Sequence, residues 1–291
     1  MSKRIVITGD RGFVGSNTKE MIAEMRPDWE VVGYDLVDGL DIRDYEQLKN
    51  FLKPGDKILH MAGYSTMKMC EDDASGGWHT NVGGTINVSK AAREVGCDRV
   101  IFSSTGTTFA PIAYVPMDEI HPQVGVNEYG WTKIQAEKAM MRYAPNWIIL
   151  RYAHISGYGK RWGVVESFRR RIERGLQPTL FGGGTQSKDF VYIKDICLAN
   201  ILALETEHTE NTYNIGTGEE LNVKEAFDIM SEVFGWTVKP ADGPPRFGDP
   251  LRMVFSTKKS KKYLGYVPKY SFKESLIDMM KEEEGRKALT G

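Results

Sequence analysis

The sequence has few cysteines, no long apolar run and almost no net charge. Cys70, Cys97 and Cys197 are too few and too far apart for a disulfide framework or a metal cluster, so no metal site is predicted. No apolar run approaches the length of a membrane span, and the N-terminus lacks the apolar segment of a signal peptide. Because 38 basic residues balance 39 acidic ones, nothing favours nucleic acid or an anionic membrane as a partner. We therefore expect a cytoplasmic protein that binds neither.

A strand, a glycine-rich turn and a helix are predicted at the start of the chain. Residues 5–7 are β-branched and suit a strand, and Gly9, Gly12 and Gly15 follow before a helical segment at residues 16–25. This order presents free backbone N–H groups, at the positive end of a helix, to a phosphate. The spacing is G-x-x-G-x-x-G rather than the commoner G-x-G-x-x-G, and an ordinary glycine-rich turn remains the alternative for the motif alone.

An acidic residue strengthens the prediction of a dinucleotide site. The second predicted strand, residues 30–34, ends in Asp35, at about the 20-residue distance from Gly15 where an acid binds a ribose. Asp35 would accept hydrogen bonds from the ribose hydroxyls and repel a 2′-phosphate. Arg11, within the glycine turn, is a counter-signal because an arginine can hold that phosphate. We expect NAD as the cofactor, with NADP as the less favoured alternative.

Strand and helix patterns alternate through the first half of the chain. Strands at residues 57–60, 100–103 and 147–152, with helices at 78–95 and 128–143, predict a parallel sheet covered on both faces. The second half changes to short strands around a glycine run, with further helices.

The fold predicted from this pattern is α/β. Residues 1–155 form a Rossmann-type, doubly wound parallel sheet that binds NAD, and residues of about 185–215 return to it. Residues 156–291 form a smaller α+β substrate lobe that is interleaved with the first domain.

The segment that carries the predicted reaction contains Tyr129 and Lys133. These residues lie four apart, and therefore on one face of the predicted helix. A lysine ammonium beside a tyrosine favours the phenolate, which makes Tyr129 a candidate base near neutral pH. Ser103, Ser104 and Thr105 end a strand at the sheet edge where ligands bind, so Thr105 or Ser104 can hydrogen-bond the same substrate oxygen. A Tyr–Lys pair at this spacing also arises by chance on amphipathic helices.

The sequence resembles the extended short-chain dehydrogenase/reductase family, in particular its nucleotide-sugar epimerase/dehydratase group, in which the UDP-glucose 4-epimerases fall. The resemblance extends from Ile5 to about Ser275. It is carried by the glycine turn, the Tyr–Lys pair and further signatures at Asp41-Ile42, His60-Met61-Ala62-Gly63, Asn81, Leu150-Arg151-Tyr152, Lys188-Asp189-Phe190-Val191-Tyr192, Tyr213-Asn214-Ile215-Gly216 and Leu264-Gly265-Tyr266.

The resemblance implies three sets of residues. The catalytic residues would be Tyr129, Lys133, Thr105 and Ser104. The cofactor-binding residues would be Gly9, Arg11, Gly12, Phe13, Val14, Gly15, Asp35, Asp41, Ile42, Met61, Ala62, Gly63, Asn81, Ser103, Tyr129, Lys133, Tyr152 and His154. The substrate-binding residues would be Tyr64, Thr105, Tyr129, His154, Lys188 and Arg246, with the two cations on the nucleotide diphosphate. Lys188 and Arg246 also fit ordinary surface charges, and His154 also fits a loop histidine bonded to backbone.

The reaction that the resemblance implies is a transient oxidation. A nucleotide-activated hexose, preferably a UDP-sugar, would be epimerised at C4 through a 4-keto intermediate. Dehydration is not expected, because Gly106 and Thr107 follow Thr105 where 4,6-dehydratases carry an Asp-Glu pair. The alternatives are a nucleotide-keto-sugar reductase that consumes NAD(P)H and a dinucleotide-sensing module without catalysis. The helices at 78–95 and 128–143 resemble those of a four-helix dimer interface, so a homodimer is expected.

Overall fold

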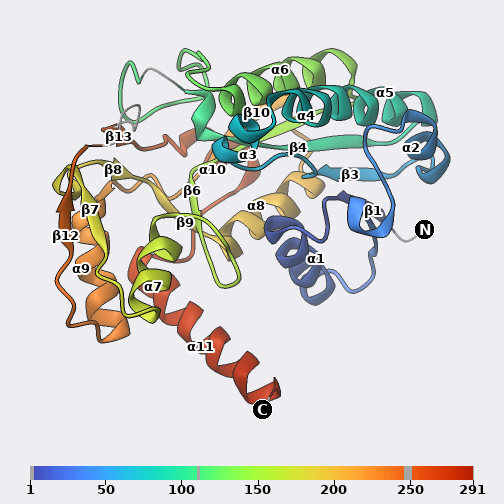
Figure 1. Ribbon diagram of the computed structural model, residues 1–291. Coiled ribbons are helices and arrows are strands. Elements are labelled where there is room, and N and C mark those ends of the chain that lie inside the picture. Colours follow the sequence, from blue (N-terminus) through green and yellow to red (C-terminus); the bar gives the residue numbers. More distant parts are fainter. Residues whose placement is uncertain (1–2, 110–111, 246–250, 291) are drawn as a thin grey trace.

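The molecule is built on a six-stranded parallel sheet, seen in a computed structural model that describes residues 3–109, 112–245 and 251–290 (Figure 1). The strand order is β10-β5-β4-β3-β1-β2, so it reverses at β1, which has β2 on one side and β3 on the other. The strands are β1 (Arg4–Thr8), β2 (Glu30–Tyr34), β3 (Lys57–His60), β4 (Arg99–Thr105), β5 (Ile148–Tyr152) and β10 (Asn211–Ile215). The predicted doubly wound α/β fold is confirmed.

Both faces of this sheet are covered by helices. In β1, Ile5 and Ile7 face one hydrophobic core and Val6 faces the other, because successive side chains of a strand point to opposite sides. Helices α1 (Phe13–Met25) and α8 (Ile193–Glu205) close the first core, whereas α2 (Tyr45–Phe51), α5 (Thr85–Val95) and α6 (Glu128–Tyr143) close the second (Figure 1).

The described part of the second half supplies short strands, four α-helices besides α8, and one strand of the main sheet. The strand pairs are β6 (His154–Ser156) with β9 (Phe190–Tyr192), β7 (Thr179–Phe181) with β12 (Ala241–Gly243), and β8 (Ser187–Lys188) between β11 (Leu221–Asn222) and β13 (Arg252–Met253). The helices are α7 (Val164–Glu173), α9 (Val223–Phe234), α10 (Lys258–Leu264) and α11 (Phe272–Thr290). β10 then returns to pair with β5, and α8 packs on α1. The division of the chain at residue 155 stays a prediction.

The segment between β3 and α5 differs from its prediction. Residues 64–77, which lie between the predicted strand at 57–60 and the predicted helix at 78–95, contain α3 (Met67–Asp72) and α4 (Ala74–Trp78). The predicted helix begins with a π-helical turn, His79–Gly84, before α5. Gly84 allows this turn to pack closely against the loop before α2, because a Cβ on residue 84 would lie 2.5 Å from the side chain of Ile42. Single π turns are frequent at functional sites, and this one carries Asn81.

Polar side chains fix the starts of several helices. The side chains of Asn127 and Asn222 cap α6 and α9. Asp195 lies in the first turn of α8, which begins at Ile193, and its buried carboxylate accepts the backbone N–H groups of Lys269 and Tyr270. Asp195 therefore ties α8 to the chain before α11. Within the described residues, no helix has both the length and the apolar character that crossing a bilayer requires.

Candidate active site

The glycine turn between β1 and α1 has no room for side chains. Gly9 has φ +77°, and a Cβ on Gly15 would lie 2.2 Å from the Gly9 carbonyl oxygen. Gly12 is the N-cap of α1 and offers no side chain to the N–H groups of Phe13, Val14 and Gly15. These groups are therefore available to an anion, as the phosphates of a dinucleotide require. The turn fits NAD by its shape as well as by its sequence.

The end of β3 lies beside this turn. The N–H groups of Met61 and Ala62 both donate to the Thr8 hydroxyl, at 3.2 Å, and a Cβ on Gly9 would lie 2.8 Å from the Ala62 nitrogen. Gly9 and the segment from Met61 to Gly63 thus meet at the point where the strand order reverses. In open parallel sheets this is where ligands bind.

The acids on the ribose side are held in place by the backbone. Asp35 accepts the N–H of Arg11 on one oxygen and that of Val37 on the other, at 3.1 and 3.0 Å. A carboxylate has about four lone-pair sites, so both oxygens can still accept ribose hydroxyls. The guanidinium of Arg11 is paired with Asp38, which sequence analysis did not single out.

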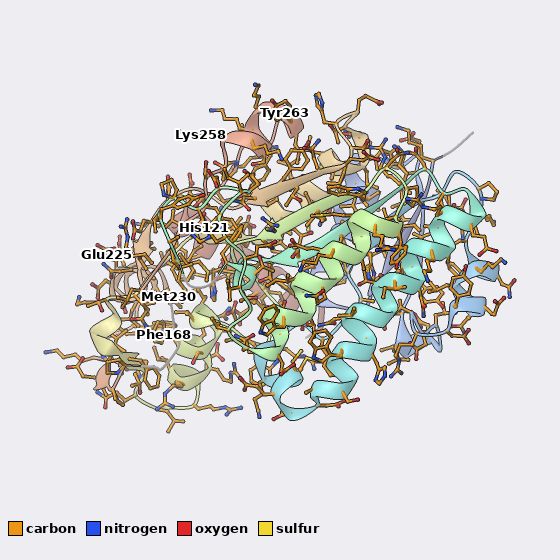
Figure 2. All side chains as sticks on the ribbon, turned by 90° about the horizontal axis from the view of Figure 1, so that it is seen from above. His121, Phe168, Glu225, Met230, Lys258 and Tyr263 are labelled. Carbon is orange, nitrogen blue, oxygen red and sulfur yellow. The ribbon has the colours of Figure 1, made fainter. Side chains whose placement is uncertain are left out.

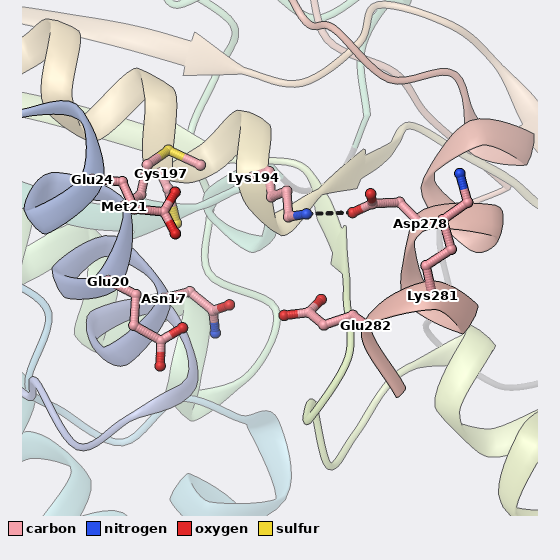
Figure 3. Close-up of a pocket in the computed structure, with 9 residues that line it drawn as sticks. All are labelled: Asn17, Glu20, Met21, Glu24, Lys194, Cys197, Asp278, Lys281 and Glu282. Carbon is pink, nitrogen blue, oxygen red and sulfur yellow. Dashed lines mark hydrogen bonds and ion pairs between the residues drawn. The ribbon is translucent and has the colours of Figure 1, made fainter. Parts of the chain in front are cut away.

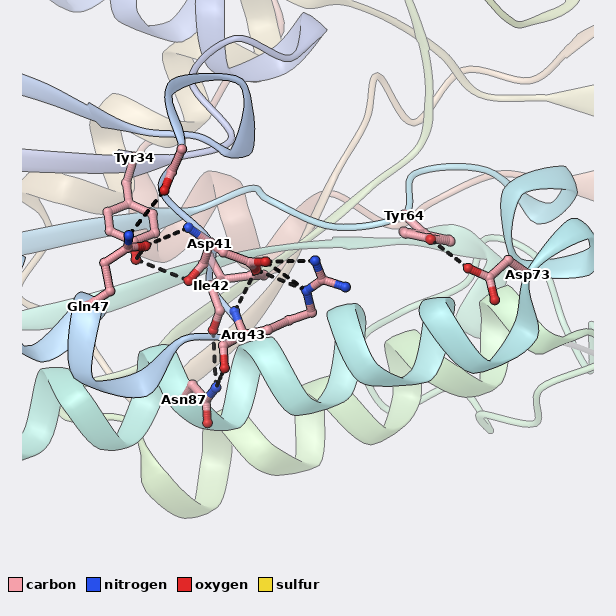
Figure 4. Close-up of polar contacts among 9 residues, drawn as sticks. Tyr34, Asp41, Ile42, Arg43, Gln47, Tyr64, Asp73 and Asn87 are labelled. Atoms are coloured by element: carbon pink, nitrogen blue, oxygen red, sulfur yellow. Dashed lines mark hydrogen bonds and ion pairs between the residues drawn. The ribbon is translucent and has the colours of Figure 1, made fainter.

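Asp41 and Ile42 form a hydrogen-bonded corner after β2 (Figure 4). The side chain of Arg43 pairs with the Asp41 carboxylate, and this contact lowers the pKa of Asp41. Asn87, on α5, donates to the Ile42 carbonyl oxygen at 3.2 Å. Arg43 and Asn87 thus both hold this corner in place, and the Ile42 side chain is buried against the π turn.

Asn81 does not behave as a free cofactor ligand. Its oxygen accepts the N–H of Tyr64 at 2.8 Å, and its two amide hydrogens go to the Tyr64 carbonyl and the Thr132 hydroxyl. Thr132 in turn donates to the Tyr129 carbonyl. With both donors used, Asn81 joins the loop after β3 to the first turn of α6. The Tyr64 hydroxyl itself donates to Asp73, at 2.9 Å (Figure 4).

Tyr129 and Thr105 meet at the carboxyl end of β4. Thr105 is the last residue of that strand, Tyr129 lies in the first turn of α6, and the Thr105 side chain is within hydrogen-bonding reach of the phenol. Burial raises the pKa of Tyr129 to about 12, and the contact with Thr105 offsets only part of this. The two hydroxyls therefore lie beside each other, and their contact with the same substrate oxygen stays a prediction.

Lys133 does not yet act on Tyr129 in this conformation. Its Nζ atom donates to the Ser103 carbonyl oxygen at 2.6 Å and lies 4.2 Å from the centre of the Phe102 ring. Burial lowers the pKa of Lys133 to about 8. In this conformation the ammonium therefore contacts the strand backbone and the phenol is desolvated, so the acidic phenol beside a bound cofactor stays a prediction.

Ser104 points away from Thr105 and has a different partner. Its hydroxyl donates to Glu137 of α6, and Glu137 forms a buried ion pair with Arg151 of β5, at 2.7 Å. Of the two hydroxyls that the sequence left open, Thr105 is the one beside Tyr129. We therefore assign Ser104 to holding α6 against the sheet and not to the reaction.

Two further residues expected near the cofactor satisfy each other. The Tyr152 hydroxyl donates to Asn200 of α8 at 2.7 Å, so the Ser103 hydroxyl must donate to Tyr152, at 2.9 Å. Burial raises the pKa of Tyr152. This chain of hydrogen bonds connects β4, β5 and α8 behind the site.

The residues expected on the substrate side come from β6 and β8. Burial, with the nearby Lys160 and Lys188, lowers the pKa of His154 well below its ordinary value, so the imidazole is neutral. Its Nε2 atom accepts the N–H of Val164, while Lys188 is buried on β8. Arg246, the other expected cation, lies outside the described residues.

The chain matches a known protein family that accounts for these features together. Residues 5–216 match the NAD dependent epimerase/dehydratase family. The chain belongs to this family. The predicted resemblance is thereby confirmed, and the epimerase/dehydratase fold with its glycine turn makes this an NAD-dependent enzyme.

Individual relatives are similar over nearly their whole length. A UDP-glucose 4-epimerase of Lacticaseibacillus casei is 27% identical, over 94% of this chain and 94% of its own. The structure of the Thermotoga maritima UDP-glucose 4-epimerase with UDP-glucose has a TM-score of 0.88 at 28% identity, and covers 98% of this chain and 99% of its own. That of the Thermus thermophilus UDP-glucose 4-epimerase with NAD has a TM-score of 0.83 at 27% identity, over 97% and 99%.

In this epimerase-family chain, several residues that position the site were not predicted from the sequence. Glu137 follows Tyr129 and Lys133 at the same four-residue spacing, so a buried acid on that helix face was a signal that could have been used. Asp38 and Asn87 gave no such signal, because their partners are distant in sequence.

Figure 3 shows a pocket between α1, α8 and α11, with an ion pair between Lys194 and Asp278 across it. None of the residues predicted for the cofactor or the sugar lines this pocket. It is therefore separate from the site of the family's chemistry.

Proposed function

We propose that this chain is a nucleotide-sugar epimerase that inverts C4 of a nucleotide-activated hexose, with a UDP-sugar as the favoured substrate. The observation that carries this proposal is the pairing of Tyr129 with Thr105 at the sheet edge beside the glycine turn. The names of the relatives, which are UDP-glucose 4-epimerases, support the sugar and the carbon atom.

The proposed reaction begins with a proton transfer. Tyr129 removes the proton of the C4 hydroxyl, and Thr105 donates a hydrogen bond to the oxygen as it becomes a carbonyl. When bound, NAD+ supplies the hydride acceptor and its positive charge. For Tyr129 to act as a base, its pKa must fall from about 12, so Lys133 must turn from the Ser103 carbonyl toward the phenol.

Inversion needs the keto sugar to turn over within the substrate lobe, after which the hydride returns to the other face of C4 and Tyr129 returns the proton to the oxygen. His154, with its neutral imidazole, is the residue proposed to hydrogen-bond a sugar hydroxyl, and Lys188 is the cation proposed for the diphosphate. We keep Arg246 in the proposal as its second cation. Lys188 presents a point charge where an arginine would bind in a bidentate manner, so the diphosphate contact is less directional.

The packing around Gly106 disfavours a dehydration reaction. A Cβ at this position would lie 2.8 Å from the Phe255 ring, so the turn after Thr105 has no room for an acidic side chain. Elimination from C5 and C6 needs both a base and an acid there. The predicted preference for epimerisation over dehydration therefore has a steric basis.

The decisive experiment identifies the product. We expect incubation with a panel of UDP-, GDP- and dTDP-hexoses to give the C4 epimer of one of them, by NMR, without net consumption of NADH. Tyr129→Phe should lower turnover by about 10² to 10⁴-fold, since it removes the acid–base group. Tyr143→Phe, at the other end of α6, is the matched control and should leave turnover unchanged.

The alternatives give different results in the same assay. Stoichiometric consumption of NADPH with a keto sugar indicates the reductase. Binding of NAD without turnover of any sugar, together with an inert Tyr129→Phe change, indicates a sensing module. Full activity of Tyr129→Phe contradicts the proposed base.

We propose, finally, that the chain is a cytoplasmic homodimer. Helices α5 and α6 lie side by side on the outside of the sheet, where Figure 2 shows them running parallel to its plane. Trp78, Trp131 and Met141 expose 38–42% of their surface on α4 and α6. Such apolar side chains suit a helical interface with a second copy.

A further inference from the structure

Arg11 and Asp38 form a clamp beside the ribose acid. The Nε and Nη2 atoms of Arg11 donate to the two carboxylate oxygens of Asp38, at 2.9 and 3.0 Å. Asp38 ends the short 3₁₀ turn Leu36–Asp38, which directly follows Asp35. The Arg11 backbone N–H, at the same time, donates to Asp35. One arginine thus connects the glycine turn with both acids after β2.

The two signals at this point have opposite meanings for cofactor choice. An acid at the end of β2 accepts the ribose 2′-hydroxyl of NAD, whereas an arginine nearby accommodates the 2′-phosphate of NADP. This chain carries both, as Asp35 and Arg11. The ion pair favours NAD over NADP. Asp38 accepts two of the guanidinium N–H donors in a bidentate arrangement and neutralises their charge, and a 2′-phosphate would need the same two donors.

We infer that Asp38 is a specificity-determining residue that keeps the enzyme on NAD by holding Arg11 away from a 2′-phosphate. The inference rests on the proposed use of the NAD site and not on the identity of the sugar. In this inference Asp35 recognises the ribose hydroxyls, and Asp38 pairs with the guanidinium of Arg11 so that it does not bind a 2′-phosphate.

The charge distribution supports this division of roles. Asp38 is the main cause of the raised pKa of Arg11, followed by Asp10 and then by Asp35. Lys19 pairs with Asp10, at 2.8 Å, so the three acids and the two cations leave one negative charge in excess, which disfavours an added phosphate. The side chains of Arg11 and Asp38 are 57% and 40% exposed, so the effect must weaken as salt screens it.

The test is a comparison of cofactor affinities, measured by the fluorescence of NADH and NADPH bound to cofactor-stripped protein. In Asp38→Asn we expect the affinity for NADPH to rise by about tenfold or more, because a charge-assisted arginine–phosphate contact becomes available. The affinity for NADH should change by less than about threefold. The gain should shrink at high salt.

Three further variants make the result specific. In Arg11→Ala with Asp38→Asn the gain should disappear, and in Arg11→Ala alone NADPH should stay weakly bound. Asp28→Asn removes the same charge at an exposed turn and should change neither affinity.

Two results overturn the inference: an unchanged NADPH affinity in Asp38→Asn, or a gain that persists without Arg11, since the latter reflects lost repulsion alone. Failure of the unsubstituted protein to bind NADH overturns the NAD site itself, whereas failure to act on any sugar leaves these affinities intact.

Discussion

Adjacent hydroxyls on β4 have different roles because strand side chains alternate. Thr105 faces Tyr129, whereas Ser104 faces Glu137 of α6. We expect Thr105→Ala to lower kcat by about a hundredfold, as for the loss of one donor to a developing oxyanion. Ser104→Ala should leave kcat nearly unchanged and lower the free energy of unfolding by about 1–3 kcal/mol. Equal losses of kcat in the two variants contradict this assignment.

His60 is a buried histidine whose hydrogen bonds define its tautomer. The Thr85 hydroxyl donates to the Asn81 carbonyl, so it accepts from Nε2 of His60, at 2.9 Å. Nδ1 must then accept a hydrogen bond from the Thr8 hydroxyl, at 2.8 Å. The lone pairs of the Thr8 oxygen are left to accept the backbone N–H of Met61, in the loop after β3. The neutral ring thereby orders the backbone beside the glycine turn.

This buried ring predicts a loss of stability in acid. Burial lowers the pKa of His60 from 6.5 to about 3, so below pH 6.5 only the unfolded chain gains this proton. Its contribution is complete above pH 6.5 and is lost toward pH 3. Between pH 6.5 and 5 we expect the free energy of unfolding to fall by about 1.4 kcal/mol per pH unit more than in His60→Asn. Urea unfolding measures this, with the exposed His208→Asn as control; parallel profiles for the protein and His60→Asn refute it.

At the scale of elements, α6 is fixed to the sheet by one buried ion pair. Glu137 accepts Arg151 on both oxygens, at 3.0 and 2.7 Å, and also receives Ser104 and Gln123. Since α6 carries both Tyr129 and Lys133, this pair sets their height above β4.

Replacing this acid should therefore destabilise the fold. We expect Glu137→Gln to cost about 3–5 kcal/mol in the free energy of unfolding, because Arg151 stays buried without a counter-charge. Glu173→Gln, which removes an exposed partner of Arg169, should cost less than about 1 kcal/mol. Chemical denaturation compares the two; a small effect at Glu137 means that α6 is held by apolar packing.

Elements with local signals were predictable from sequence. β2, β3 and α6 have the predicted bounds, because short apolar runs define the two strands and Asn127 caps the helix. The π turn and α3 were not, because Asn81 and Gly84 act through contacts with Tyr64 and Ile42 that no local pattern records.

The site followed the same rule. The glycine turn, Asp35, Thr105 and Tyr129 could be proposed from the sequence because motif spacing indicates their chemistry directly. The direction in which Lys133 points was not, since it depends on the Ser103 carbonyl, which every sequence would offer alike. The role of Asp38 could not be predicted either, because its partner, Arg11, lies 27 residues earlier in the sequence.

At the scale of the whole molecule, the exposed face of α6 predicts self-association. Light scattering at micromolar concentration should give about twice the chain mass of 32.8 kDa. Met141→Glu should yield monomers, because it places a charge on that apolar face. Ile120→Glu, at an exposed apolar residue outside the helix, should remain dimeric. A monomeric parent protein refutes the dimer.

The return of β10 to the main sheet affects how the protein is made. A ribosome releases residues 1–155 well before β10 and α8, which complete the edge beside β5 and cover α1. Until residue 215 has emerged, the nascent chain presents an open strand and an uncovered apolar helix. Open strand edges and uncovered apolar surface favour association with other chains, so we expect this interval of synthesis to be the one most prone to aggregation.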